Sequence, residues 1–315
     1  MYCFIHPGHI NKILTVLMTV VLVTFDGIPY ISHDLTKYKI SYGNRIQRDV
    51  QWRHTPASSP CPPHVTVIAF VTSSPDHRER RDRIRNTWAN PVYYPHKDLK
   101  FLFVIGATAN ASVQAAVDEE VAQFDDIIQN NFNDSYRNLT YKTIAWLSWV
   151  VNHCPDVPFA LKVDDDVVVN PFGLQVLYGK INRKTISQRN EGKPAVGKIY
   201  GRIILSQPQR HGRWALSKEE YAANYFPPYA TGAAYIVDNV ALKKLWDHVP
   251  LAPFLWIEDV FLTGMVAREA ELKHEWLNYL YLEKQLSEYW YREYGIFLFE
   301  ASPQDAQKAW DHIIK

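Results

Sequence analysis

The chain has 315 residues, of which 47% are apolar and 21% charged, and its formal net charge is +1. This length allows one large domain or two small ones, and the apolar fraction is sufficient for a sizeable core. A net charge near zero argues against a nucleic-acid-binding protein. The twelve histidines and three cysteines show no spaced cluster of the kind that binds zinc.

The N-terminus carries an apolar run from Ile13 to Phe25 that follows Lys12. At about 1.5 Å per residue the run is shorter than a ~30 Å hydrocarbon core. Ile10 and the Ile28–Ile31 segment lengthen it, although Asp26 interrupts. It is therefore either a signal peptide or a short signal anchor. Because no small-x-small cleavage pattern lies near Asp26, we favour an anchor. We predict a cytoplasmic tail at residues 1–12, a single signal-anchor helix at 13–31 and a luminal body.

Residues 32–63 are polar and end in the turn-rich stretch PASSPCPP, which predicts a stem before a body at 64–315. Cys61 and Cys154 each lie shortly before a predicted strand. If those strands are neighbours, both thiols lie at one end of a sheet and a disulfide is possible, although the sequence does not establish it.

The first half of the body alternates apolar strands with helical periods, which predicts an α/β fold: a mixed, mostly parallel sheet with helices on both faces. We expect a helix from a cap at Ser73 or Ser74 through Trp88. The second half is less regular and has an aromatic loop at 225–232. The expected strands are 65–71, 99–105, 126–129, 159–163, 196–205 and 233–237, and the other expected helices are 112–124, 138–153, 240–248 and 258–272.

Three adjacent carboxylates, Asp164, Asp165 and Asp166, follow the predicted strand 159–163. Like charges next to apolar flanks are unfavourable unless something compensates them. A divalent cation such as Mg²⁺ or Mn²⁺, which prefers carboxylate oxygens, would do so. The carboxyl end of a strand is also where open α/β sheets bind ligands. The alternative is an acidic turn that caps the following segment.

A second acidic pair, Glu258 and Asp259, stands between apolar residues at a predicted helix start. Acidic residues favour the first turn of a helix for structural reasons alone. The functional interpretation is a carboxylate in an apolar cleft that acts as a general base, with a pKa raised by burial.

Three further patterns are weaker. Arg81 and Arg85 share one face of the first predicted helix, which suits a diphosphate but also a solvated, paired face. Several aromatic residues suit sugar stacking but also core packing. These aromatic residues are Trp214, Tyr221, Tyr225, Tyr229 and Tyr235. The third pattern is a set of Asn-x-Ser/Thr sequons, which suit a glycosylated luminal body. They lie at Asn110, Asn133 and Asn138.

Seven segments in order and spacing resemble the β-1,3-galactosyltransferase-like family, glycosyltransferase family 31. The resemblance extends over about residues 65–303. The segments are RRDRIRNTW (80–88), FLFVIGAT (101–108), DIIQNNFNDSYRNLTYKT (126–143), LKVDDDVVVN (161–170), RWALSKEEY (213–221), FPPYATGAAY (226–235) and EDVFLTG (258–264).

The resemblance implies a GT-A fold, a type II Golgi membrane protein and an inverting β-1,3 transfer from a UDP-sugar, galactose favoured, to a glycan of a glycoprotein or glycolipid. It implies Mn²⁺ as cofactor, held mainly by Asp166. By position, Asp164 and Asp165 would serve the nucleotide and the metal shell, and Asp259 would be the catalytic base. It further implies that Arg81 and Arg85 lie near the donor, and Trp214, Tyr229 and Glu258 near the acceptor.

One departure from the family pattern bears on the metal. Many members have a metal-binding histidine before a C-terminal Ser-Pro, where this chain has Phe299, and His274 has no supporting spacing as a substitute. Phe299 motivates one alternative, an inactive membrane-anchored relative that binds glycans or partners. Two others remain open: transfer of GalNAc or GlcNAc by the same machinery, and a secreted metal-dependent hydrolase that uses the same Asp cluster.

Overall fold

The computed structural model describes residues 50–57, 61–93, 98–192, 194–282, 295–299 and 302–315. The chain divides into two compact units, Met1–Lys39 and Ile40–Lys315, and every described residue belongs to the second. The predicted tail, the anchor at 13–31 and most of the stem lie outside the described residues. Among the helices that are described, none has the length and apolar character needed to cross a bilayer.

An eight-stranded mixed sheet forms the centre of the unit, in the order β1-β4-β3-β2-β5-β8-β7-β9. The neighbours β4, β3, β2 and β5 are all parallel, as the alternation of strands and helices predicts. The strands are β1 (Trp52–His54), β2 (Val67–Thr72), β3 (Leu99–Ala107), β4 (Ile127–Asn133), β5 (Phe159–Asp164), β7 (Lys198–Ile204), β8 (Tyr229–Asp238) and β9 (Lys273–Trp276).

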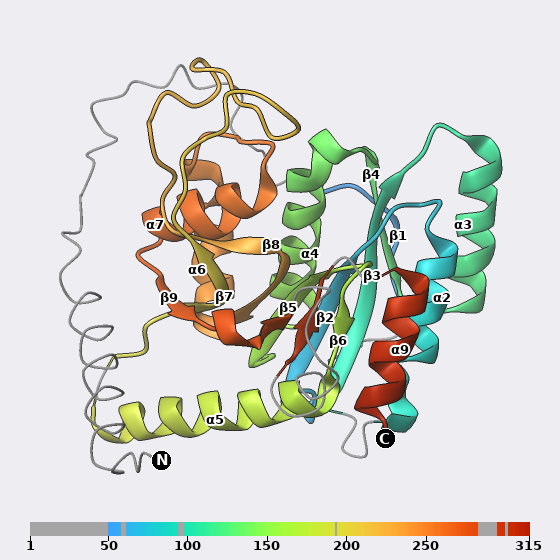
Figure 1. The fold of residues 1–315 in the computed structure, drawn as a ribbon, viewed down its shortest axis with the longest axis horizontal. Coiled ribbons are helices and arrows are strands. Elements are labelled where there is room, and N and C mark those ends of the chain that lie inside the picture. Colours follow the sequence, from blue (N-terminus) through green and yellow to red (C-terminus); the bar gives the residue numbers. More distant parts are fainter. Residues whose placement is uncertain (1–49, 58–60, 94–97, 193, 283–294, 300–301) are drawn as a thin grey trace, which may run out of the picture. The chain divides into compact units, whose positions relative to one another are not determined.

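Helices cover both faces of the sheet, with a separate apolar core on each (Figure 1). One core includes residues of α4 (Leu139–His153), α6 (Asn239–His248) and the π-helical segment η5 (Val260–Val266), which continues into α7 (Ala267–Glu269). The other includes residues of α2 (Arg78–Asn86), α3 (Ala111–Gln123), α5 (Pro171–Asn190) and α9 (Pro303–Ile313). The layered arrangement predicted from the sequence is therefore confirmed.

A second, three-stranded sheet includes the short strand that follows the acidic triplet in the chain. Its order is β10 (Tyr281–Leu282), β11 (Phe297–Leu298) and β6 (Val168–Val169). Neither this sheet nor the helices α5 and α9 is among the predicted elements. Single 3-10 turns occur at Pro91–Tyr93, Tyr136–Asn138, Val249–Leu251 and Asn278–Leu280.

Two predicted boundaries need correction. The expected stem contains β1, which pairs antiparallel with β4 at the sheet edge, so the folded body starts before residue 64. The first helix begins at Arg78 rather than at a cap formed by Ser73 or Ser74. The reason is local: Ser73 and Ser74 use their hydroxyls on Asp165 and Asp76 instead of on helix N–H groups.

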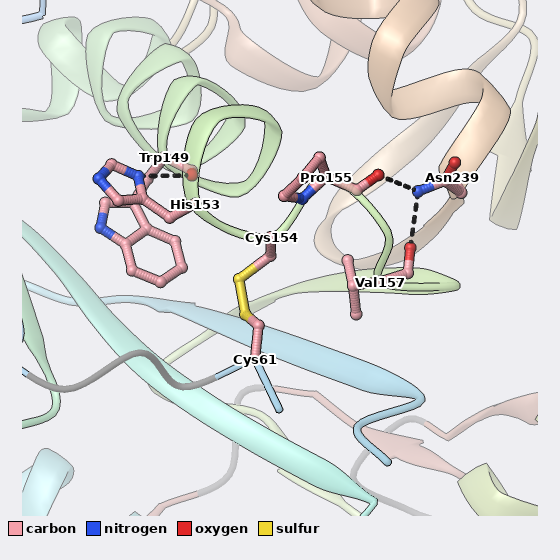
Figure 2. The surroundings of a disulfide bond; sticks show 7 residues. All are labelled: Cys61, Trp149, His153, Cys154, Pro155, Val157 and Asn239. Carbon is pink, nitrogen blue, oxygen red and sulfur yellow. Dashed lines mark hydrogen bonds between the residues drawn. A yellow bond between two sulfur atoms is a disulfide. The ribbon is translucent and has the colours of Figure 1, made fainter. Parts of the chain in front are cut away.

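Cys61 and Cys154 form a disulfide, with their Cα atoms 5.6 Å apart and 93 positions apart in sequence (Figure 2). Cys154 follows the last residue of α4, and Asn239, at the start of α6, donates to the carbonyls of Pro155 and Val157 beside it. The pairing considered possible from the sequence is thus present, and it joins the segment before β2 to the end of α4.

Candidate active site

The acidic triplet lies where β5 ends, beside the end of the parallel strand β2. Thr72, the last residue of β2, donates its hydroxyl hydrogen to Asp164 Oδ1 over 2.6 Å. The next residue, Ser73, donates to Asp165 Oδ2 over 2.7 Å. The parallel pairing of β2 with β5 brings these groups together, because the carboxyl ends of neighbouring parallel strands meet at one edge of a sheet.

Two residues at the start of α2 complete the surroundings of Asp165. Its Oδ2 lies 2.8 Å from His77 Nδ1, and its Oδ1 accepts from Arg80 Nη1 over 2.8 Å. Burial works to raise the pKa of Asp165, but the hydrogen bonds from His77 and Ser73 outweigh it, so the pKa is lowered. The hydrogen bond with Asp165 raises the pKa of His77 in turn. Asp165 is therefore a buried, ionised anchor for this loop.

Asp166 differs from its two neighbours because its nearest cation lies further away. Its side chain is 41% exposed, and the nearest guanidinium, that of Arg80, is 3.7 Å away. Burial, followed by the charges of Asp164 and Asp165, raises the pKa of Asp166. A cation bound to this carboxylate would relieve that repulsion. The carboxylate oxygens of Asp166 therefore fit a hard divalent metal ion that takes one ligand from the protein.

Arg81 lies in a fully buried position and uses its guanidinium inside the protein. It donates to both carboxylate oxygens of Glu120, to Ser73 Oγ and to the carbonyls of Ser74 and Pro75. Those hydrogen bonds occupy all five donors of the side chain. The expectation that Arg81 lies against the donor is therefore corrected: in this structure it holds the 73–75 loop in place.

Arg85, one helical turn further, is also committed within the protein. Its side chain is 8% exposed, it forms paired hydrogen bonds with Asp126, and its guanidinium lies over the rings of Phe103 and Phe124. The structure does not bring Arg85 to the acidic triplet. Arg80 is the arginine of this segment that reaches it.

Lys162 links the acidic triplet to the second acidic pair. Its side chain is 3% exposed, and Nζ lies 2.6 Å from Asp164 Oδ1 and 3.1 Å from Glu258 Oε1. It also donates to the carbonyl of Gly232 on the adjacent strand β8. Burial lowers the pKa of Lys162, but the charges of Asp164 and Glu258 outweigh it, so the pKa is raised and the lysine stays charged.

Glu258 is the buried member of the second pair. Its Oε2 accepts from Thr143 over 3.0 Å and lies 3.4 Å from the hydroxyl of Tyr235. Burial raises the pKa of Glu258 to about 7, with a further increase from the charge of Asp259 and an opposing effect of Lys162. A group with this pKa is poised to change its proton occupancy near neutral pH.

Asp259 is only partly buried and lies at the start of the π-helical segment. Its Oδ2 accepts from the N–H of Gly232 over 2.9 Å and its Oδ1 from the N–H of Val260 over 2.8 Å. Burial nevertheless raises its pKa. Gly232 permits the close approach of both carboxylates, because a Cβ there would lie 2.7 Å from Glu258 Oε1 and 3.4 Å from Asp259 Oδ2. The arrangement presents one oriented carboxylate, which suits general-base chemistry.

Trp214 and Tyr229 lie in different surroundings. Trp214 is 46% exposed, and its indole Nε1 donates to the hydroxyl of Tyr136. The guanidinium of Arg213 lies 4.2 Å from the centre of the Tyr136 ring. Tyr229 is partly buried, with its hydroxyl 3.2 Å from Ser206 Oγ. Trp214 therefore belongs to an exposed aromatic surface, whereas Tyr229 packs at the start of β8.

The three sequons occupy surface segments with different geometry. Asn110 is exposed and caps α3 through its side-chain oxygen. Asn133 is exposed at the end of β4. Asn138 is partly buried, its amide donates to the carbonyl of Asn133, and the sequon residue Thr140 is fully buried. Asn110 and Asn133 thus offer the more accessible acceptors, and glycosylation at all three stays a prediction.

Phe299 lies next to the acidic triplet. Leu298 pairs with Val168, which puts Phe299 one residue further along, at the end of β6 that follows Asp166. Its ring packs against Tyr281, with centroids 5.3 Å apart. His274 is occupied elsewhere, with Nε2 2.7 Å from the carbonyl of Thr263. Within the described part of the chain, no group of three His, Cys, Asp or Glu side chains is arranged to hold a metal.

Comparison with known proteins settles the family. The family model described as galactosyltransferase matches residues 79–278, which contain both acidic clusters. The chain belongs to this galactosyltransferase family, glycosyltransferase family 31. The β-1,3-galactosyltransferase 5 of Pan paniscus is 31% identical over 217 residues, or 67% of each chain. The human N-acetyllactosaminide β-1,3-N-acetylglucosaminyltransferase 4 is 29% identical over 252 residues, covering 76% of this chain and 63% of the relative.

Among solved structures, this chain is similar to the galactosyltransferase LgtC, whose crystal structure contains donor and acceptor sugar analogues. The match has a TM-score of 0.40 and 11% identity, covering 78% of this chain and 95% of that one. The family assignment rests on the sequence matches alone. As a member of this family the chain is a glycosyltransferase by descent, and its two acidic clusters lie inside the matched region.

Sequence reasoning missed three groups of this candidate site: His77, Arg80 and Lys162. For Lys162 a signal was present, because a lone lysine in the middle of an apolar strand needs a buried partner. For His77 and Arg80 the signal was their position in the first turn after the loop that follows β2. That loop ends at the same sheet edge as the acidic triplet.

Proposed function

We propose that this protein is an inverting β-1,3-glycosyltransferase that moves a hexose, galactose favoured, from a UDP-sugar to a hydroxyl of a glycan. The observation that carries the proposal is the oriented carboxylate of Asp259, connected through Glu258 and Lys162 to the acidic triplet at the end of β5. The family membership and the curated relatives support the same reaction class.

In the proposed reaction Asp259 removes the proton from the acceptor hydroxyl. The acceptor oxygen then bonds to the anomeric carbon of the donor sugar from the side opposite the leaving group. The bond between that carbon and the diphosphate oxygen breaks with inversion, UDP leaves and the proton remains on Asp259. Lys162 and the N–H groups of Gly232 and Val260 hold the two carboxylates in place. Because one direct displacement inverts the anomeric carbon, the reaction needs no covalent intermediate on the enzyme.

We propose Asp166 as the metal ligand, with Asp164 and Asp165 around the nucleotide. When bound, Mn²⁺ would neutralise charge on the diphosphate leaving group. Arg80, rather than Arg81 or Arg85, is the guanidinium placed to meet a donor phosphate, because it is 38% exposed beside Asp165 and Asp166. We also propose a GT-A fold, a luminal catalytic domain and a single-pass type II Golgi location, with the anchor at residues 13–31.

Transfer of GlcNAc or GalNAc is a second candidate, favoured by the similarity to the human N-acetylglucosaminyltransferase. The two donor classes differ at C2, where galactose carries a hydroxyl and an N-acetylhexosamine an acetamido group. The pocket contacts around C2 therefore decide between them, and a screen of UDP-sugars separates the two.

The test is donor turnover by the full chain with a mixed glycan acceptor panel, with Mn²⁺ and with EDTA. The variants are Asp259→Asn and Asp166→Ala, and Asp156→Asn, an exposed carboxylate elsewhere on the surface, is the matched control. We expect metal-dependent transfer that falls by about 10²- to 10⁴-fold in Asp259→Asn. Retained transfer in that variant would reject Asp259 as base.

Absence of transfer with every donor, from folded protein that also fails to bind UDP, would favour the inactive relative. Phe299→His then tests whether the residue beside Asp166 is the cause, because it restores an imidazole at that position. Gain of UDP binding in Phe299→His would locate the defect there.

A further inference from the structure

Helix α5 (Pro171–Asn190) has one buried face and an outward face that combines apolar and positively charged side chains. It runs along the lower margin of the folded unit in Figure 1. Its inward side chains Leu174, Leu177, Tyr178 and Ile181 are buried, and the Tyr178 ring stacks on Phe159 of β5 at 4.9 Å. This face fixes the orientation of the helix, so its opposite face is a stable part of the surface.

Three large apolar side chains lie on that opposite face. Phe172 is 43% exposed, Val176 58% and Ile186 56%. At about 100° per residue the three fall within a sector of roughly 80° along the helix. Together they form an apolar stripe of about 20 Å that no described residue covers.

The charges on the same helix are all positive. Lys180, Arg183, Lys184 and Arg189 lie between Pro171 and Asn190, and the segment contains no Asp or Glu. Lys184 forms a long, exposed ion pair with Glu275 at 3.7 Å. Within the described part of the chain, no carboxylate forms an ion pair with Lys180 or Arg183. The angular positions place Arg183 in the middle of the apolar stripe and Lys180 at its side.

We propose that the outward face of α5 docks on the surface of an anionic lipid bilayer. A helix with aliphatic and aromatic side chains beside lysine and arginine lies in the plane of such a surface, with its apolar residues among the acyl chains and its cations at the headgroups. A second copy of the same face is disfavoured, because two such faces would bring like charges together. The proposal is independent of the sugar-transfer reaction.

The test uses the full chain in lipid bilayers, with Cys3→Ser so that the Cys61–Cys154 disulfide leaves no other thiol. Val176→Cys carries an environment-sensitive fluorophore. Val92→Cys, which is 75% exposed on a different element, carries it in the matched control. Bilayers of phosphatidylcholine alone are compared with bilayers that also contain phosphatidylglycerol, and a neutral quencher measures access from water.

We expect a blue-shifted emission and several-fold weaker quenching at position 176 in the anionic bilayers only, and no change at position 92. The triple variant Lys180→Gln, Arg183→Gln, Lys184→Gln loses the shift, since each cation near the surface contributes about fivefold to partitioning. The control triple Lys243→Gln, Lys273→Gln, Lys308→Gln removes the same charge from other surfaces and keeps the shift.

Equal quenching at position 176 in both bilayers overturns the proposal. So does a shift that the control triple abolishes as completely as the α5 triple, because that would be an effect of net charge alone. A shift in neutral bilayers that grows with protein density would identify a protein–protein contact instead, and would also overturn it.

Discussion

Lys162 Nζ and Glu258 Oε1 lie 3.1 Å apart inside the protein, with side chains 3% and 7% exposed. The two residues come from β5 and from the segment before the π-helical turn. The same ammonium group lies 2.6 Å from Asp164. A single buried cation therefore balances carboxylates from both acidic clusters, and the position of each cluster depends on the other.

Removing that cation is expected to cost stability. Lys162→Met keeps most of the volume but leaves Glu258 and Asp164 without their cation, so we expect a loss of about 3–5 kcal/mol in the free energy of unfolding. Adding Glu258→Gln to the Lys162→Met variant removes one of the two unpaired charges and should restore part of the lost free energy of unfolding. A double-mutant cycle by urea denaturation should give a coupling of about 1–3 kcal/mol. Additive single effects would show that the two side chains do not interact.

Gly232 sets how closely β8 approaches Glu258. A Cβ at this position would lie 2.7 Å from Glu258 Oε1 and 3.4 Å from Asp259 Oδ2. We expect Gly232→Ala to displace both carboxylates and to lower sugar transfer by about 10²-fold, because small misplacements of catalytic groups are costly. Gly179→Ala in α5 is the control, since its Cβ would meet only the end of Arg183 at 3.7 Å. Equal activity of the two variants would contradict the assignment.

Local patterns were sufficient for the central strands and for the acidic clusters. The apolar runs before Thr72 and Asp164 identify buried strands, and carboxylates directly after such a strand lie at the ligand-binding edge of an open α/β sheet. The same local reasoning failed at α5. The pair Asn170-Pro171 predicts the end of a regular element. Proline is nevertheless well suited to the first turn of a helix, and α5 begins at Pro171. The Asn170 side chain accepts a hydrogen bond from the N–H of Gly173 in that first turn.

The arginines show where local reasoning stops. Spacing puts Arg81 and Arg85 on one face of α2 but does not say which face meets the sheet edge. That choice depends on Glu120, 39 positions from Arg81, which attracts both guanidinium groups into the interior. Burial works to raise the pKa of Glu120, but the hydrogen bonds from Arg81 outweigh it and lower the pKa. Pairing over such a sequence distance is invisible without the fold.

Arg80 and Arg81 are adjacent in sequence but should respond differently to substitution. Arg81→Met removes two charge-assisted hydrogen bonds from the buried carboxylate of Glu120, which keeps its ion pair with Arg85, so we expect a destabilisation of about 3 kcal/mol. Arg80 is 38% exposed, and its partner Asp165 keeps the hydrogen bonds with His77 and Ser73, so Arg80→Met should cost less, about 1–2 kcal/mol. Arg80→Met should also weaken UDP binding, measured by calorimetry. Unchanged UDP affinity in Arg80→Met would exclude a donor contact.

Glu258 should make folding pH-dependent in a defined window. The pKa of Glu258 is 4.5 as a reference value for the unfolded chain and about 7 in the folded protein. Between these pH values the folded state therefore binds more protons than the unfolded state. Stability contributed by this group is therefore highest below about pH 4.5 and falls by about 3 kcal/mol as the pH rises to 7. Relative to wild type, Glu258→Gln should gain stability over that interval, as followed by denaturant titrations at a series of pH values. A constant difference would rule out the shift.

The disulfide between Cys61 and Cys154 should stabilise the fold by restricting the unfolded chain. It closes a loop of 93 positions, for which the chain-entropy model gives about 4–5 kcal/mol. We expect Cys61→Ser/Cys154→Ser to unfold at lower temperature and lower urea concentration than wild type. Dithiothreitol should bring wild type down to the level of the double variant and leave the variant unchanged, whereas Cys3→Ser should behave as wild type in both conditions. If the oxidised wild type and the double variant melt together, the disulfide contributes no net stability, and the segment before β2 is held instead by the pairing of β1 with β4.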